Sequence, residues 1–487
     1  RMQIDLPQPG LPTPRHLTSS SISPTRFLLM PYRNLVTIFL TAIVSFACYR
    51  TAQKNRYAST IGSAMTIIEE QALQPSTRRD LFYAAMDGMM NSLDEHSAFI
   101  DPDRLPELEE HLDQEFGGVG FIVETHPETQ ALTIVCPLMN TPAFRAGISA
   151  GDVITAIDGQ SSEGMNSSDA VNKIKGPRGT QVTLTLQSSE TGELRDVDLV
   201  RELISVESVV GDRRKPDGSW EYTLEDHPEI AYVRIKEFGE KTATELEAVA
   251  ETLPENIRGL ILDLRYNSGG LLDRAVEVCD LFLNEGTIVT IKSRGGEPDR
   301  PPYTAELGTA FPDKLPVAIL INSGTASASE IVAACLQDHE CATVVGERSY
   351  GKGTVQQIIK IDGGRSALKL TVSSYWRPSG RNIHRLNGEE SDEWGVLPDP
   401  GYEVPLTDEQ ARRQFLWQRQ REYPATVLSD EIVERLLQRE RESSAVVPSA
   451  EDSPSDPNPD QESDPDPQLR KAIEAVVASS DVNVALQ

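Results

Sequence analysis

The sequence predicts an α/β protein with a separate β-domain and a helical N-terminal region. Three patterns lead to this prediction, and they occupy successive parts of the chain. Residues 60–105 carry apolar side chains at helical spacing, residues 114–201 read as short strands, and residues 202–402 alternate buried-looking strands with helices. Alternation of this kind is typical of an α/β architecture, in which helices cover a sheet.

The bulk properties limit the number of domains and the class of partner. A chain of 487 residues is too long for one ordinary domain, so two or three are expected. The formal net charge of −29 argues against nucleic acid as a partner, because phosphate repels an acidic protein. The five cysteines follow no zinc spacing. Cys335 and Cys341 are placed to pair in an oxidising compartment, whereas Cys136 and Cys279 lie in apolar runs typical of buried thiols.

The N-terminal part of the chain contains a candidate export segment. Residues 1–29 are rich in proline, serine and threonine and predict disorder. In residues 30–58 a short basic stretch precedes the apolar run 35–49, whose 15 residues are short for a transmembrane helix and normal for an export signal. We interpret this segment as a signal that can remain as a membrane anchor. It predicts an exported protein of the cell envelope or periplasm.

The N-terminal helical region is assigned to residues 59–112, and one cluster in it suggests a metal site. Asp94, Glu95 and His96 are consecutive, and all three residue types can ligate metals. Neighbours on one helix point in different directions, so a shared ligand site is not expected. The sequence predicts capping or turn roles here, no metal site, and a reaction insensitive to chelators.

The β-domain is assigned to residues 113–201 and opens with the glycine-rich stretch Phe116–Phe121. Together with residues 151–159, this stretch resembles the carboxylate-binding loop of PDZ domains. The resemblance implies that a peptide C-terminus adds a strand to the sheet edge, while backbone N–H groups turn toward its carboxylate. The peptide-binding residues that it implies are Gly118, Val119, Gly120 and Phe121.

Two segments of the α/β region carry candidate catalytic residues. Residues 322–330 form a small-residue turn between an apolar strand and an apolar helix. Such a turn can lift a serine hydroxyl to a helix N-terminus, where backbone N–H groups are unpaired, and three serines qualify: Ser323, Ser327 and Ser329. The second segment, residues 349–356, places Lys352 between two glycines. A lysine in an apolar, crowded pocket loses its proton readily and can act as a base.

The second segment also overlaps a nucleotide-binding motif. Residues 346–352 match the first seven positions of the phosphate-binding loop G-x-x-x-x-G-K. The eighth position is Gly353, so the hydroxyl that would ligate magnesium is missing. Residues 354–359 are β-branched and strand-like, whereas a phosphate loop needs a helix N-terminus there. The nucleotide-binding interpretation therefore fails on both counts.

Taken together, the motifs resemble those of the C-terminal processing (tail-specific) peptidases, serine peptidases that use a Ser-Lys dyad. The matching stretches are residues 262–271, 324–331 and 350–356, and the resemblance spans roughly residues 60–402. It implies an α/β core similar to those of crotonase and ClpP, with an inserted PDZ domain. It also implies that no cofactor is needed.

The resemblance, rather than spacing, selects the catalytic residues. It makes Ser327 the nucleophile, Lys352 the general base and Gln356 the residue that orients the lysine. The backbone N–H that follows the nucleophile, that of Ala328, is one expected oxyanion donor. The second is expected from Gly269 or Gly270, and the sequence does not distinguish between them.

The predicted function is a serine endopeptidase that captures the C-terminal tail of exported proteins through its PDZ domain and cleaves near it through an acyl-enzyme. The expected substrates are proteins with free, apolar C-termini. A homo-oligomer is a further partner state that the sequence allows. A catalytically silent PDZ scaffold is the main alternative. A crotonase-type acyl-CoA enzyme and a Ser-His-Asp mechanism are the others.

The C-terminal part of the chain completes the domain plan. The peptidase core is assigned to residues 202–405, and a helical extension follows at residues 406–445. Residues 446–467 read as an acidic disordered linker, since seven acidic residues and no basic one lie between positions 451 and 468. Residues 468–487 read as a short helix and tail. Neither helix carries visible chemistry.

Overall fold

The computed structural model describes residues 32–52, 56–126, 130–215, 218–298, 300–312, 314–385, 394–422 and 464–485. The chain divides into two compact units, Arg1–Ala85 and Met86–Gln487. The predicted disordered segment 1–29 and residues 446–463 of the predicted linker lie outside the described residues.

The first unit is helical in its described part. Helix α1 (Tyr32–Ala52) contains the apolar run interpreted above as an export segment. Helix α2 (Arg56–Gln71) follows, and α3 (Arg78–Asn91) begins in this unit, where Arg78 pairs with Glu69 of α2 at 3.0 Å. Among the helices that the structure describes, none is long and apolar enough to cross a membrane.

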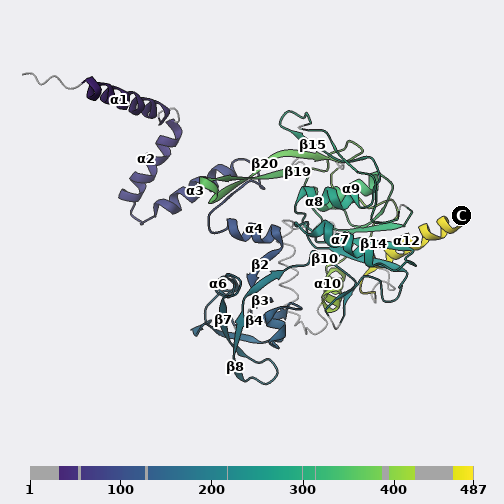
Figure 1. Ribbon diagram of the computed structural model, residues 1–487. Helices are drawn as coiled ribbons and strands as arrows, with labels where there is room; N and C mark the ends of the chain where they lie inside the picture. The colour runs from purple at the N-terminus through teal and green to yellow at the C-terminus, as the bar shows by residue number, and fades with distance from the viewer. Residues whose placement is uncertain are drawn as a thin grey trace, which may run out of the picture. The chain divides into compact units, whose positions relative to one another are not determined.

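The second unit contains the β-domain (Figure 1), in which an antiparallel sheet of order β3-β4-β5-β7-β8 carries β6 beside β5. Alternating residues of β7, such as Val182, Leu184 and Leu186, enter a common core, so the predicted strand pattern is confirmed. The elements are β3 (Phe121–Thr125), β4 (Leu132–Pro137), α5 (Pro142–Arg145), β5 (Val153–Ile157), β6 (Gln160–Ser161), α6 (Ser167–Ile174), β7 (Gln181–Gln187) and β8 (Leu194–Val200).

A short two-stranded ladder connects the β-domain to the α/β core. Strand β2 (Glu115–Gly118) enters the domain and pairs antiparallel with β9 (Glu202–Ser205), which leaves it. Helix α4 (Leu105–Asp113) directly precedes β2. It ends at Gln114, whose left-handed conformation (φ 57°) turns the chain into the strand.

The core sheet has the order β10-β13-β14-β17-β18, and its strands from β13 to β18 are parallel. Continuous runs of branched apolar residues form the buried strands β14 and β17, as expected for a parallel sheet covered on both faces. The predicted strands are confirmed to within one residue at each end. Their bounds are β10 (Val209–Val210), β13 (Ile230–Ile235), β14 (Gly259–Asp263), β17 (Val317–Ile321) and β18 (Thr343–Gly346).

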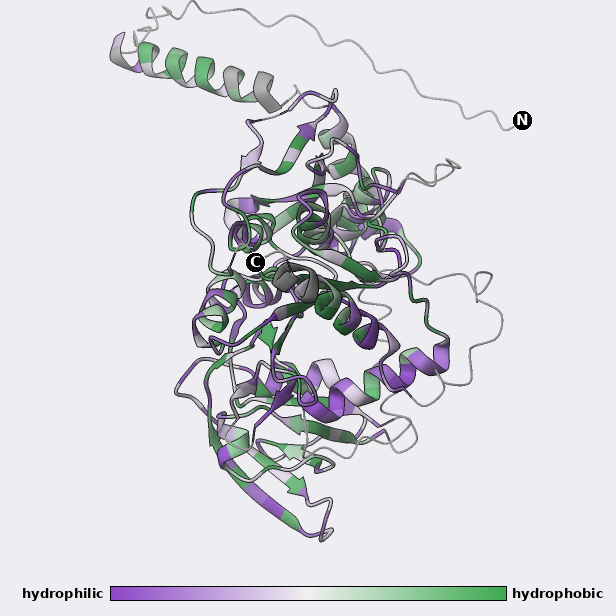
Figure 2. Cartoon of the chain, turned by 90° about the vertical axis from the view of Figure 1, so that its right-hand side faces the viewer, coloured by the Kyte–Doolittle hydropathy of each residue, from purple (hydrophilic) through white to green (hydrophobic). Residues whose placement is uncertain are grey.

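Helices cover both faces of this sheet (Figure 1). One face packs against α7 (Thr242–Thr252), α8 (Leu272–Asp280) and α9 (Ala328–Asp338). The other face packs against α12 (Pro467–Ala485), with α10 (Asp408–Glu422) beside it. Figure 2 shows the hydrophobic residues concentrated on these central strands. The core is therefore a three-layer α/β/α sandwich, and its last layer comes from the C-terminal part of the chain.

A second sheet extends from the core and carries the lysine segment. Its order is β1-β20-β15-β16, with β19 also paired to β20. Strand β19 begins two residues after Lys352, as the strand-like residues 354–359 predict. The bounds are β1 (Ala98–Ile100), β15 (Thr287–Ser293), β16 (Tyr303–Thr304), β19 (Thr354–Ile361) and β20 (Ser366–Trp376); β11 (Arg213–Arg214), β12 (Trp220–Glu221) and the 3-10 turn η1 (Asp362–Gly364) complete the elements.

The cysteines are all free thiols. The expected pairing of Cys335 with Cys341 is wrong, because Cys335 faces the core from α9 whereas Cys341 is exposed beyond the helix end. Cys136 and Cys279 are buried, as their apolar sequence context predicts.

Candidate active site

Ser327 occupies a sharp turn between β17 and the first residue of α9. Its backbone has φ 58° and ψ −116°, a region that L-residues other than glycine rarely adopt. The neighbouring Ala326 donates its N–H to the Asn267 carbonyl at 3.0 Å, which fixes the turn to the loop that follows the neighbouring strand β14. The strained turn therefore presents the Ser327 side chain at the start of a helix, as the small-residue segment predicts.

Glu330, one turn into α9, joins the two predicted catalytic segments. Its fully buried carboxylate accepts the N–H of Ser327 at 2.8 Å and the N–H of Lys352 at 2.9 Å. It also accepts from the Gly351 N–H at 2.7 Å and the Ser349 hydroxyl at 2.6 Å. Burial raises the pKa of Glu330, although these hydrogen bonds oppose the rise. One carboxylate thus fixes the spacing between the serine turn and the lysine loop.

Lys352 has the surroundings expected of a basic amine. Burial, aided by the positive charge of Lys369, lowers the pKa of Lys352 to about 8, while Glu330 and Glu95 oppose the change. The Tyr375 hydroxyl donates to the Lys352 carbonyl and to the Ser327 carbonyl, the latter at 3.2 Å. The loop is therefore held through its backbone, and the Lys352 side chain lines the cavity.

Ser327, Lys352 and Gln356 line one cavity of about 550 Å³. Within the described part of the chain, no hydrogen bond joins the Lys352 amine to the Ser327 hydroxyl. The Gln356 amide Nε2 donates instead to the hydroxyls of Thr354 at 2.9 Å and Thr371 at 3.3 Å. Among the described residues, the structure brings the three predicted residues to one cavity without a hydrogen bond between their side chains.

The predicted oxyanion residues lie in the same cavity. A Cβ atom on Gly269 would lie 2.7 Å from the Ser327 Cβ and 3.0 Å from the Ala328 nitrogen, so only glycine allows this approach. The Gly269 N–H already donates to Asn267 Oδ1 at 2.9 Å. Among the described residues, the N–H groups of Gly270 and Ala328 have no acceptor. Availability therefore favours Gly270 over Gly269 as the second donor.

Sequence reasoning missed several residues of this cavity. His96 and Lys369 both line it, and burial together with the charge of Lys352 lowers the pKa of His96. The turn role predicted for the neighbouring Asp94 is confirmed, since its carboxylate accepts the N–H of His96 at 2.8 Å and that of Ser97 at 2.9 Å. Glu330 had a signal in the sequence, because a serine followed three residues later by glutamate is the capping-box spacing.

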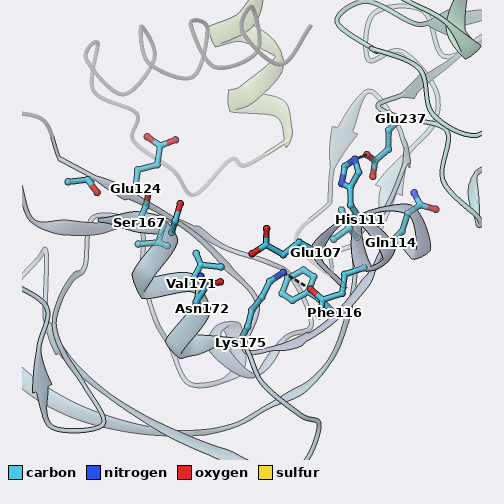
Figure 3. Close-up of a pocket in the computed structure, with 15 residues that line it drawn as sticks. Glu107, His111, Gln114, Phe116, Glu124, Ser167, Val171, Asn172, Lys175 and Glu237 are labelled. Carbon is cyan, nitrogen blue, oxygen red and sulfur yellow. Dashed lines mark hydrogen bonds and ion pairs between the residues drawn. The ribbon is translucent and has the colours of Figure 1, made fainter. Parts of the chain in front are cut away.

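A second cavity of about 840 Å³ lies beside the β-domain (Figure 3). Its walls come from strand β3, helix α6 and helix α4, with Val123 and Val171 among the apolar lining. Lys175, just after α6, pairs with Glu110 of α4 at 2.7 Å, and its amine lies 4.5 Å from the centre of the Phe116 ring. This is the groove between sheet edge and helix in which an added strand can lie.

The predicted carboxylate-binding residues lead into this groove but do not line it. Gly118, Val119 and Gly120 are buried at the end of β2, and Phe121 begins β3. Within the described residues, the N–H groups of Val119 and Gly120 have no acceptor. A Cβ atom on Gly120 would lie 2.3 Å from the Thr141 side chain, which explains the glycine.

The His111 Nε2 atom lies 3.0 Å from the Glu237 carboxylate, and both residues line both cavities. His111 comes from α4, and Glu237 precedes Phe238, whose N–H donates to the Gly269 carbonyl at 3.0 Å. The groove of the β-domain and the cavity of the serine are therefore neighbours that share one wall.

The fold and the two cavities define a class of protein, a serine-type peptidase with a PDZ domain. Comparison with family models agrees: residues 229–400 match Peptidase family S41, and residues 133–188 match the PDZ domain. The chain belongs to peptidase family S41.

Relatives confirm the predicted family. A carboxy-terminal-processing protease of Bartonella bacilliformis is 36% identical over 381 residues, which cover 76% of this chain and 82% of the relative. A carboxyl-terminal-processing protease of Synechocystis is 34% identical over 342 residues, covering 69% and 75%. Among solved structures, a photosystem II D1 C-terminal processing protease is 27% identical, covers 71% of this chain and 92% of its own, and has a TM-score of 0.39.

Proposed function

We propose that this peptidase recognises the C-terminal tail of a protein with its PDZ domain and cleaves nearby, with Ser327 as nucleophile and Lys352 as general base. The observation that carries the proposal is that the strained serine and a lysine whose pKa burial lowers to about 8 line one cavity. A neutral amine is needed to accept the serine proton, and such a pKa keeps a useful fraction neutral near physiological pH.

In the proposed reaction, neutral Lys352 accepts the proton of the Ser327 hydroxyl as the oxygen attacks the scissile carbonyl. The N–H groups of Ala328 and Gly270 stabilise the oxyanion, and the lysine returns the proton to the leaving amine. Water then hydrolyses the acyl-enzyme, again with Lys352 as base. Because no hydrogen bond joins the two side chains in the described structure, the lysine must first swing toward the serine, as catalytic groups without substrate often do.

Gln356 is suited to orient the lysine. Its Nε2 group donates to Thr354 and Thr371. The carbonyl Oε1 is therefore the atom of the amide that can accept a hydrogen bond from a group in the cavity. A carbonyl oxygen can accept only, and an amine or ammonium can donate to it. We therefore assign Gln356 the role of holding Lys352 at the attack position.

The β-domain supplies the tail-binding groove. A peptide would add a strand to β3 and lie against α6, with its carboxylate at the free N–H groups of Val119 and Gly120. His111 and Glu237 border both cavities, so the chain that leaves the groove has a short route to Ser327. For the core we propose a spiral fold similar to those of crotonase and ClpP.

We also propose that the protein is exported and held at a membrane by residues 30–58, and that its substrates are exported proteins with free, apolar tails. The apolar run within α1 supports this proposal. Fractionation of cells that express the full chain, followed by detection in the envelope, periplasmic and soluble fractions, tests it. Recovery in the cytoplasm alone would contradict export.

The catalytic proposal is tested with a folded reporter protein that ends in a free apolar tail. Ser327→Ala and Lys352→Ala should each abolish cleavage, whereas Ser323→Ala, in the same turn, serves as the matched control and should cleave normally. Amidation of the tail should suppress cleavage by the unchanged protein. Mass spectrometry of the cleavage products is the measurement for every variant and for the amidated tail. Equal cleavage by Ser327→Ala and the unchanged protein would contradict the assignment of Ser327 as nucleophile.

A histidine-dependent mechanism is the second candidate, because His96 lines the catalytic cavity. The two mechanisms separate in one assay. If Lys352 is the base, His96→Ala keeps most of the activity and Lys352→Ala has none. The reverse pattern would favour the histidine.

A further inference from the structure

Arg265 is a fully buried arginine at the base of residues 266–270, the loop after β14 that carries Gly269 and Gly270 and is called the glycine loop below. Its guanidinium carries five N–H groups, and each has an acceptor. Asp263 accepts from Nε at 2.9 Å and from Nη2 at 2.6 Å. Asp466 accepts from Nη1 and from Nη2, both at 2.9 Å, and Gln468 accepts from Nη1 at 3.1 Å. Three of the five acceptor positions are therefore supplied by the segment that begins α12.

Asp466 is itself held firmly. Its residue is 3% exposed, and its Oδ1 accepts the Leu469 N–H at 3.0 Å, which caps the first turn of α12. Gln414 of α10 donates to the same oxygen at 2.9 Å. Burial alone would raise the pKa of Asp263, but the charge and hydrogen bonds of Arg265 hold it below its usual value. The cluster is thus a charged, hydrogen-bonded network in the interior.

Helix α12 fits one place on the core sheet. Gly259 begins β14, and a Cβ atom there would lie 1.9 Å from Cγ1 of Val476, so only glycine lets the helix approach. Ser480 donates to the Arg258 carbonyl at 2.8 Å, and Leu469 packs into the core on this face of the sheet. The position of Asp466 is consequently set by packing along the length of the helix.

Arg265 also lies one residue from the loop that reaches the nucleophile. Tyr266 follows it in a left-handed conformation (φ 59°) and donates its N–H to Asn322 Oδ1 at 2.9 Å. The carbonyl of Asn267 then accepts the Ala326 N–H at 3.0 Å and the Ser329 hydroxyl at 2.9 Å. If Arg265 moved, the backbone of Gly269 and Gly270, four and five residues later, would move with it. The serine turn would also move, because it is hydrogen-bonded to Asn267.

From these contacts we propose that Asp466 is a positioning residue for catalysis, and that α12 completes the peptidase site by fixing Arg265 under the glycine loop. The inference rests on the proposed role of Ser327. It extends the catalytic unit beyond residues 229–400, the range that the family model matches. Loss of one partner from a buried charge network leaves the other partner uncompensated, so the network is sensitive to a single substitution.

The test uses the full chain with Asp466→Asn, which keeps the shape of the side chain and removes its charge. Leu469→Ala is the matched control, because it loosens α12 without touching Arg265. We expect Asp466→Asn to lower kcat about 10²-fold with KM nearly unchanged, since small misplacements of reacting groups cost factors of this size. A peptide boronate, whose adduct with a serine mimics the oxyanion, should lose affinity by a similar factor. In the double variant Asp466→Asn/Gln468→Glu, a carboxylate faces Nη1 again, and kcat should recover in part.

The outcomes separate positioning from stability and from the proposed function. The two variants are compared when their losses of Tm are equal. A larger loss of kcat in Asp466→Asn than in Leu469→Ala then supports positioning. Wild-type kcat in Asp466→Asn, or equal kcat losses in both variants, would overturn it. Ser327→Ala is run in the same assay: if it stays active, the proposed function fails, and if it is inactive while Asp466→Asn is fully active, only the positioning inference fails.

Discussion

The Glu330 carboxylate lies between the two segments that carry the proposed catalytic residues and accepts the backbone N–H of Lys352 at 2.9 Å. Because it also accepts the N–H of Ser327, the backbones of the proposed nucleophile and the proposed base are spaced by a third, fully buried residue. Proton transfer requires a separation within hydrogen-bond reach, and anchoring both backbones to one carboxylate fixes the position from which the Lys352 side chain would swing toward Ser327.

Glu330→Gln should lower both activity and stability. The amide nitrogen replaces one acceptor oxygen and faces backbone donors, so at least one buried N–H loses its partner, at a cost of about 1–3 kcal/mol. We expect a lower Tm and a kcat decrease of about 10²-fold. Glu340→Gln, an exposed site just beyond α9, is the control and should behave as the unchanged protein. Wild-type kcat in Glu330→Gln would show that the carboxylate does not set the geometry.

The pH dependence of cleavage should follow Lys352. Its pKa is about 8, and the neutral amine is the reactive form, so kcat/KM should rise as the pH increases through that value. The profile is measured with the reporter protein between pH 6 and 10, alongside a fluorescence check that the fold is intact. A profile that is flat across this range would mean that the base is a different group.

Lys369→Met should shift this profile to higher pH. Lys352 faces Lys369 from β20, Glu330 from α9, and Glu95 and His96 from the turn before β1. Loss of the Lys369 charge removes a repulsion on protonated Lys352, so the pKa of Lys352 rises and less neutral amine is present at neutral pH. Lys369→Arg keeps the charge and should keep the profile. Identical profiles for the Met and Arg variants would exclude an electrostatic role.

Lys352→Met should stabilise the protein while abolishing cleavage. The pKa of Lys352 is lowered from 10.5 to about 8 in the folded state, so the unfolded chain binds the proton more tightly. Below pH 8 this difference costs the folded state roughly 3 kcal/mol, and the cost disappears as the pH rises toward 10.5. Denaturant unfolding at pH 7 should therefore show a gain for the variant that shrinks at pH 10. A loss of stability at pH 7 would show that the amine is well solvated.

The sequence predicts the core strands well, because β13, β14, β17 and β18 are short runs of buried branched residues with little alternative. The proposed nucleophile is different. Position alone left three serines open, and only the folded chain shows that the Ser329 hydroxyl is bonded to the Asn267 carbonyl while Ser327 holds the strained turn. Local pattern predicts where elements form, but it does not show which hydroxyl the turn leaves available.

The residues that surround the proposed dyad are harder to predict, since they come from distant parts of the chain. Lys369 reaches the cavity from β20 and His96 from the turn before β1, and β1 pairs with β20 across more than 260 residues of sequence, as Ala98 opposite Lys369 shows. Asp466 lies in a stretch whose acidic, proline-rich composition predicts disorder, yet its carboxylate is used by a buried arginine. Composition describes the average environment of a segment and misses one residue that a distant partner requires.

The pairing of Arg265 with Asp466 also sets an order of events during synthesis. The two residues are 201 positions apart, so at ordinary translation rates Asp466 is made about 10–40 s after Arg265. For the last 114 of those positions, after Lys352, a nascent copy contains both Ser327 and Lys352 but lacks the carboxylate that completes the Arg265 network. On the proposed positioning role of Asp466, a nascent copy gains full cleavage activity only after translation has passed the start of α12.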